Sequence, residues 1–192
     1  MIKPELLINL EQKFGGFVGG VANGRKATGG DRMGGPGRRH RYAQHYSDHL
    51  PMDPKVVIEL GVFKGTGLAI WCDLYPRACV IGLDIDLSNF QENKQRLIEL
   101  GAFRHNQPQI YQFNKYKDDL GTILNGQSVD VLIDDSCHKT EGIVLFLKNN
   151  IHHVSDTGVI FVEDNTKVHK RLIGTFPDYQ IHPNHNMTIM MK

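Results

Sequence analysis

The stretch VVIELGVFKGTGLAIW, from Val56 to Trp71, decides the fold of this 192-residue chain. Its first five residues are apolar apart from Glu59, which is typical of a buried strand. Three glycines follow at the turn: Gly61, Gly65 and Gly67. A helix is predicted next, over Thr66–Leu74. A buried strand that runs through a glycine turn into a helix is the first unit of a parallel α/β sheet.

The same alternation of strands and helices continues to the end of the chain. Further strands are predicted over Cys79–Leu83, Gln109–Phe113, Val129–Ile133 and Val159–Val162. Helices are predicted over Ser88–Leu100 with Ser88 as N-cap, Asp118–Leu124, His138–Ile151 and Val168–Gly174. The tail predicts a hairpin, with strands over Asp178–Ile181 and Met187–Met191. We therefore predict an α/β fold, a doubly wound and mostly parallel sheet with a C-terminal antiparallel hairpin.

The N-terminal region, residues 1–54, is expected to differ from the sheet domain, residues 55–192. Helices are predicted over 2–14 and 39–50. Between them, residues 15–37 hold ten of the twenty glycines. Glycine loses the most entropy on ordering, so no regular structure is expected there. The segment is either a lid over a site or a disordered stretch.

Composition narrows the class of protein. A hydrophobic content of 40% with 22% charged residues is typical of a soluble globular domain. A net charge of +1 argues against a general nucleic-acid binder, and no apolar run approaches the roughly 18 residues of a membrane span. The N-terminus lacks signal-peptide features, and the three cysteines form no CxxC pair, so we expect a cytoplasmic protein. A homo-oligomer is compatible with the sequence.

The glycine turn is a candidate cofactor site, because ligands of such sheets bind outside the carboxyl ends of the strands. Its spacing, GxxxGxG, fits neither the dinucleotide fingerprint GxGxxG nor the P-loop. The second strand ends at Asp84, where an acid can bind both ribose hydroxyls. Glu59, near the end of the first strand, suits an ammonium group. Ribose and ammonium without phosphate describe S-adenosylmethionine; the alternative is an ordinary turn with solvated acids.

Two acid pairs follow the fourth and fifth strands: Asp134 with Asp135, and Glu163 with Asp164. Neighbouring parallel strands end at one edge of a sheet, so we expect the four carboxylates to converge beside the cofactor. Crowded carboxylates repel each other unless a cation is present, and oxygen ligands favour Mg²⁺ or another hard divalent cation. Alternatively, Asp134, Asp135 and Ser136 cap the next helix, while Glu163 and Asp164 are solvated.

His138 lies three residues after Asp135 and could face the same crevice. An imidazole, with an ordinary pKa of about 6.5, suits a general base near neutral pH. Four aromatic side chains just after the glycine-rich segment could line an acceptor pocket, although a buried helix face is the simpler account: His40, Tyr42, His45 and Tyr46.

Four stretches read together resemble a known family: ELGVFKGTGLAIW, VIGLDID, VDVLIDDSCH and GVIFVEDN. They are similar to the metal-dependent class I S-adenosylmethionine O-methyltransferases of antibiotic biosynthesis. That group includes the macrocin- and mycinamicin-type sugar O-methyltransferases, the rhamnosyl O-methyltransferases and the cephalosporin hydroxylase family. The resemblance covers about residues 55–166, and it implies a Rossmann-like fold.

The resemblance also implies a role for each matching residue. Cofactor contacts would come from Glu59, Gly61, Gly65, Thr66, Asp84 and Asp134. The metal ligands would be Asp135, Glu163 and Asp164, and the general base His138. The family has a GDQ motif near the adenine, after the third strand. The corresponding stretch of this chain, YQFNKYKDD, has no clean counterpart of that motif. The implied activity is Mg²⁺-dependent methyl transfer to a hydroxyl of a small molecule, such as a sugar or polyketide-type polyol.

Three alternatives stay open. The catechol and caffeoyl-CoA O-methyltransferases offer another register, in which Asp164 and Asn165 would join Asp134 and spare Glu163. The protein could instead be an S-adenosylmethionine methyltransferase without a metal. It could also be a nucleotide-binding module or an oxidoreductase on the same fold.

Overall fold

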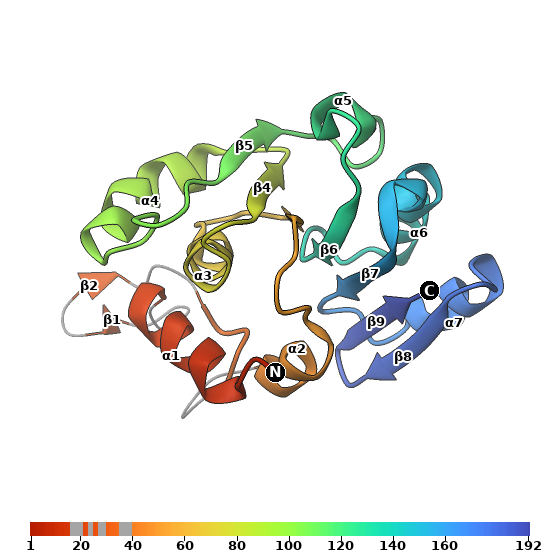
Figure 1. Ribbon diagram of the computed structural model, residues 1–192, viewed down its shortest axis with the longest axis horizontal. Helices are drawn as coiled ribbons and strands as arrows, with labels where there is room; N and C mark the ends of the chain where they lie inside the picture. Colours follow the sequence, from red (N-terminus) through yellow and green to blue (C-terminus); the bar gives the residue numbers. More distant parts are fainter. Residues whose placement is uncertain (16–20, 23–24, 27–29, 35–39) are drawn as a thin grey trace.

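A computed structural model describes residues 1–15, 21–22, 25–26, 30–34 and 40–192. Most of the predicted lid or disordered segment, 15–37, therefore lies outside the described residues. Seven strands form the central sheet, in the order β5-β4-β3-β6-β7-β9-β8 (Figure 1). They are β3 (Val56–Leu60), β4 (Cys79–Asp84), β5 (Gln109–Gln112), β6 (Val129–Asp134), β7 (Val154–Val162), β8 (Gln180–Asn184) and β9 (Met187–Met191). Strands β3 to β7 are parallel and β9 is antiparallel to both its neighbours, which confirms the predicted fold class.

Helices cover both faces of the sheet (Figure 1). One face carries α1 (Pro4–Phe14), α2 (Ala43–His49), α3 (Thr66–Leu74) and α4 (Ser88–Glu99). The other carries α5 (Gly121–Leu124), α6 (Thr140–Asn150) and α7 (Val168–Thr175), with a 3-10 turn at Ile151–His153. Successive strand residues point to opposite faces, so Phe161 packs in the first core and Ile160 in the second. Within the described ranges, no helix has the length and apolar character needed to cross a membrane.

Several predicted boundaries were wrong. Helix α6 begins at Thr140 rather than His138, because His138 has φ +53°, outside the right-handed helical region. The N-cap of α4 is Leu87, and Ser88 is already helical. In the glycine-rich segment, β1 (Val21–Ala22) pairs with β2 (Arg25–Lys26), where no regular structure was expected. None of these four paired residues is a glycine, so the entropic cost that argued against regular structure does not apply to them.

Candidate active site

The register of the sheet separates the acids by face. Leu60 pairs with Asp134, and Asp134 pairs with Val162, so these three side chains point to one face. The side chains of Asp135 and Glu163, which follow Asp134 and Val162, point to the opposite face, because side chains alternate along a strand. Consequently Asp134 faces α6, whereas Asp135 and Glu163 face α1 to α3.

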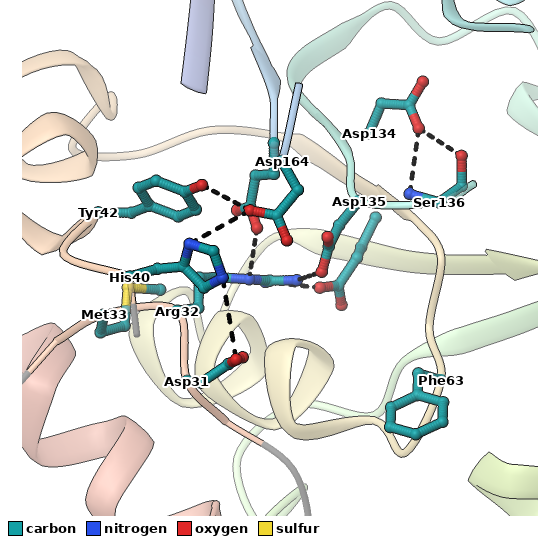
Figure 2. Close-up of polar contacts among 12 residues, drawn as sticks. Asp31, Arg32, Met33, His40, Tyr42, Phe63, Asp134, Asp135, Ser136 and Asp164 are labelled. Carbon is teal, nitrogen blue, oxygen red and sulfur yellow. Dashed lines mark hydrogen bonds and ion pairs between the residues drawn. The ribbon is translucent and has the colours of Figure 1, made fainter. Parts of the chain in front are cut away.

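Asp134 is buried and fully paired. Lys115 Nζ donates to Asp134 Oδ1 at 3.0 Å, to Oδ2 at 2.9 Å and to Ser136 Oγ at 2.5 Å. The Ser136 hydroxyl and backbone N–H also donate to Asp134 (Figure 2). The N-cap position of α6 is Lys139, and no side chain caps it. Asp134 therefore neither caps the helix nor joins Asp135; it anchors the chain around Lys115.

On the other face, three acids surround the guanidinium of Arg32. Arg32 Nη1 donates to Glu59 Oε1 at 2.7 Å, and Arg32 Nε lies 3.0 Å from Glu163 Oε2. Arg32 Nη2 donates to Asp135 Oδ2, as Figure 2 shows. The Tyr46 hydroxyl donates to the other oxygen of Glu163. The sequence predicted these acids and a metal ion among them, but not the arginine.

The electrostatics of this cluster are unbalanced. Burial disfavours the charge of Arg32, but Glu163, Glu59 and Asp135 outweigh burial and hold the pKa of Arg32 well above its ordinary value. Burial also raises the pKa of each of these three carboxyls, although Arg32 opposes the rise. One guanidinium cannot neutralise two buried carboxylates, Glu59 and Glu163, together with the half-buried Asp135. The cluster would therefore be favoured by a proton or a further cation.

Asp164 lies beside the cluster and has different partners. The Tyr42 hydroxyl donates to Asp164 Oδ1 at 2.6 Å, and His40 Nδ1 lies 3.3 Å from the same oxygen (Figure 2). Burial raises the pKa of Tyr42, and its hydrogen bond to Asp164 raises it further, so Tyr42 stays a neutral donor.

Asp164 belongs to a candidate cation position. One ligand atom each from Asp135, His138 and Asp164 lies within 4.8 Å of the others. His138 and Asp164 have φ values of +53° and +56°. Non-glycine residues rarely adopt that region, and such strain persists where the surroundings impose it, often at functional sites.

A cavity of about 500 Å³ opens at the carboxyl ends of β3, β4 and β6. Asp84 lines it, and the Asp84 carboxylate is oriented by the backbone N–H groups of Phe63, at 3.0 Å, and Asp86, at 3.1 Å. Phe63 and Ile85 also line it, and they are 56% and 60% exposed. Large apolar side chains left open to solvent beside a fixed carboxylate are typical of a ligand site.

A second hollow of about 180 Å³ adjoins the first and shares Gly61, Phe63 and Asp135 with it. Glu59, Thr66 and Arg32 also line this second hollow. Among the predicted cofactor residues, Glu59, Gly61, Thr66 and Asp84 thus line one or both hollows. Neither hollow is lined by Gly65 or Asp134. Gly65 is instead the N-cap of α3, with φ +80°, and it packs against the ring of Phe90.

The other aromatic residues named from the sequence divide between two places. His40, Tyr42 and Tyr46 reach the acids, whereas His45 Nδ1 lies 2.6 Å from the side chain of Asn184. Neither Arg32 nor Lys115 was predicted from the sequence to belong to the site. The alternation of strand side chains could have separated Asp134 from Asp135, but no local pattern marks Arg32 within its glycine-rich surroundings.

The fold is that of the Rossmann-like, class I methyltransferases. MycE methyltransferase from the mycinamycin biosynthetic pathway, in complex with Mg, SAH and mycinamycin VI, is similar at TM-score 0.60 and 18% identity, over 81% of this chain and 50% of that one. A MycE complex with Mg and SAH is similar at TM-score 0.63 and 16% identity, over 100% of this chain and 55% of that one. Precorrin-6y C5,15-methyltransferase from Geobacter metallireducens GS-15 is similar at TM-score 0.56 and 14% identity, over 78% of this chain and 85% of that one.

The chain spans about half the length of the MycE structures. No protein-family model and no curated protein matches its sequence. At these identities the similarity establishes the fold alone.

Proposed function

We propose that this protein transfers the methyl group of S-adenosylmethionine to a hydroxyl of a small molecule, such as a sugar or natural-product polyol, with the help of a divalent cation. The observation that carries the proposal is the pair of adjoining hollows around Gly61, with Asp84 at the end of β4. Their place, where the chain order of the strands reverses beside β3, is where sheets of this kind bind ligands.

The two hollows suit the two halves of the cofactor. Asp84 would accept hydrogen bonds from the ribose hydroxyls, because its carboxylate is held by two backbone N–H groups. Phe63 and Ile85 would cover the adenine. Gly61 and Thr66 would let the methionine portion approach the backbone in the smaller hollow. Glu59 is already bound to Arg32, so it would act on the ammonium group only together with that arginine.

The acid cluster fits a hard cation in part. Asp135 and Asp164 offer carboxylate oxygens at a suitable mutual spacing, with His138 beside them. Glu163 is the exception among the predicted ligands, because Arg32 and Tyr46 bind its two oxygens. When bound, such an ion would lower the pKa of the acceptor hydroxyl.

The catechol-type register has less support. It requires Asn165 and Asp134 as ligands, but Lys115 binds Asp134. Asn165 donates to the carbonyl of His138 at 2.8 Å and accepts from the N–H of Val168 at 2.8 Å, which ties it to the start of α7.

We assign proton removal from the acceptor hydroxyl to His138, which lines the larger cavity and has an exposed side chain. The variant His138→Ala is expected to lose turnover by about 100-fold or more, which is typical of a lost general base. Its Mn²⁺ affinity, measured by calorimetry, should stay near that of the wild type. A large loss of Mn²⁺ affinity would instead make His138 a ligand. His105→Ala, a change at an exposed loop residue, is the matched control.

The function as a whole is tested by calorimetry with S-adenosylhomocysteine, the product form of the cofactor. We expect the wild type to bind it and Asp84→Ala to bind it about tenfold or more weakly, since hydrogen bonds to a charged group are lost. Asp178→Ala, at an exposed position, is the control. Binding of NADH instead would refute the proposal. A screen of hydroxyl compounds for release of S-adenosylhomocysteine would then identify the acceptor.

A further inference from the structure

Arg32 occupies the space between Glu59 and Glu163, two carboxylates that could otherwise bind a metal ion. We propose that Arg32 is a built-in cation that takes over Glu59 and Glu163 and one oxygen of Asp135. A divalent ion is thereby confined to the outer position between the carboxylates of Asp135 and Asp164, beside His138. The inference rests on the proposed function only in taking Asp135 and Asp164 as the ligands of the divalent ion.

The contacts of the guanidinium support a permanent role. Three different nitrogens of Arg32 each meet a different acid: Glu59, Asp135 and Glu163. The side chain of Arg32 is only 11% exposed, and those of Glu59 and Glu163 are 1% and 2% exposed. A planar fork of donors is better matched to several fixed carboxylates than a flexible ammonium would be.

The backbone around Arg32 is also held in place. The carboxylate of Glu11, a buried residue of α1, accepts from the N–H groups of Arg32 at 2.8 Å and Met33 at 3.0 Å. The carbonyls of Asp31, Arg32 and Met33 accept from the N–H groups of His40, Tyr42 and Ala43, at 3.0, 3.0 and 3.3 Å. These five hydrogen bonds fix residues 31–33 between α1 and the start of α2, so Arg32 is positioned before any ligand arrives.

Charge then determines what else can bind. A divalent ion that reached Glu163 would lie beside the guanidinium, and like charges at contact distance repel strongly in a buried site. Glu163 has both oxygens bound, by Arg32 and Tyr46, whereas Arg32 binds Asp135 through Oδ2 and leaves Oδ1 for an ion. Asp164 escapes the repulsion, because its partners are the Tyr42 hydroxyl and His40 rather than Arg32. Asp164 can therefore bind an ion while Arg32 stays in place, whereas Glu163 cannot.

The test is Mn²⁺ binding, measured by calorimetry on the full chain. Removing the charge with Arg32→Met should raise Mn²⁺ affinity by about tenfold or more, because three acids lose their internal cation. Mn²⁺ should also raise the Tm of Arg32→Met more than that of the wild type. The control Arg77→Met removes an arginine from an exposed pair with Asp53 and should behave as the wild type. Unchanged or weaker Mn²⁺ binding by Arg32→Met, including no binding by either protein, would overturn the proposal.

A second pair of variants decides the matter if Arg32→Met does not fold. Glu163→Gln should bind Mn²⁺ within about threefold of the wild type, because Glu163 is not a ligand while Arg32 is present. Asp164→Asn should bind it about tenfold or more weakly. Equal losses in both variants would mean that Glu163 is a ligand and that Arg32 does not exclude the ion.

Binding of S-adenosylhomocysteine separates this inference from the proposed function. If that compound does not bind but Arg32→Met gains Mn²⁺ affinity, the function fails and the role of Arg32 stands. If the compound binds to the wild type and Arg32→Met gains nothing, the function stands and the role of Arg32 fails.

Discussion

Replacing Gly61 with alanine is expected to lower the free energy of unfolding by about 3 kcal/mol or more. Gly61 has φ +98°, and an added Cβ would lie 2.3 Å from the carbonyl oxygen of Asp135. The obstacle is backbone, and it cannot move away easily, because the N–H of Asp135 donates to the carbonyl of Leu60 at 2.9 Å. Denaturant unfolding followed by circular dichroism measures the loss. Since Gly61 lines both hollows, binding of S-adenosylhomocysteine should fall as well.

Gly126→Ala is the matched control. Gly126 also has a positive φ, +80°, but an added Cβ would meet nothing within 4 Å. Its loss should therefore be limited to the backbone cost, about 1 kcal/mol. Equal losses for Gly61→Ala and Gly126→Ala would contradict the close approach of the ends of β3 and β6.

Lys115→Met is expected to destabilise the fold by about 3–5 kcal/mol, because it leaves a buried carboxylate without its cation. The side chains of Lys115 and Asp134 are 6% and 1% exposed, and Lys115 Nζ contacts both oxygens of Asp134. Adding Asp134→Asn to Lys115→Met should recover part of the loss, since the unpaired charge is then gone. Equilibrium unfolding of the single and double variants measures both effects.

Arg77→Met serves here as the control for an ion pair in water. Arg77 lies 3.0 Å from Asp53, and the two side chains are 80% and 63% exposed. Solvent screens such a pair, so its loss should cost less than about 1 kcal/mol. A cost for Lys115→Met no greater than that for Arg77→Met would show that burial of the Lys115–Asp134 pair does not matter to the fold.

Asp134 and Asp135, the two adjacent acids of the IDDS sequence, thus bind different cationic side chains on opposite faces of the sheet. Lys115 binds Asp134 on the α6 face, and Arg32 binds Asp135 on the α3 face. Asp134 then holds Lys115 and Ser136, which line the larger cavity, while Asp135 lines both hollows. The two acids have different partners because successive side chains of a strand point to opposite faces of the sheet.

The strands and helices of residues 55–192 could be predicted because each carries either a continuous run or a periodic pattern of apolar residues. The place of Asp84 followed from the end of a strand beside a glycine turn. Boundaries failed where backbone conformation overrode pattern, as at His138, whose positive φ delays the start of α6.

The sequence by itself determined the parallel sheet, the edge at which the acids gather and the glycine turn that lines the two hollows, since these depend on local patterns and on the common direction of parallel strands. Only the tertiary structure decided how the acids are shared. Arg32 lies 27 residues from Glu59 and 103 from Asp135 along the chain, and packing of residues 31–33 against Glu11 brings it among them. A contact between such distant residues depends on how whole elements pack, which no local pattern records.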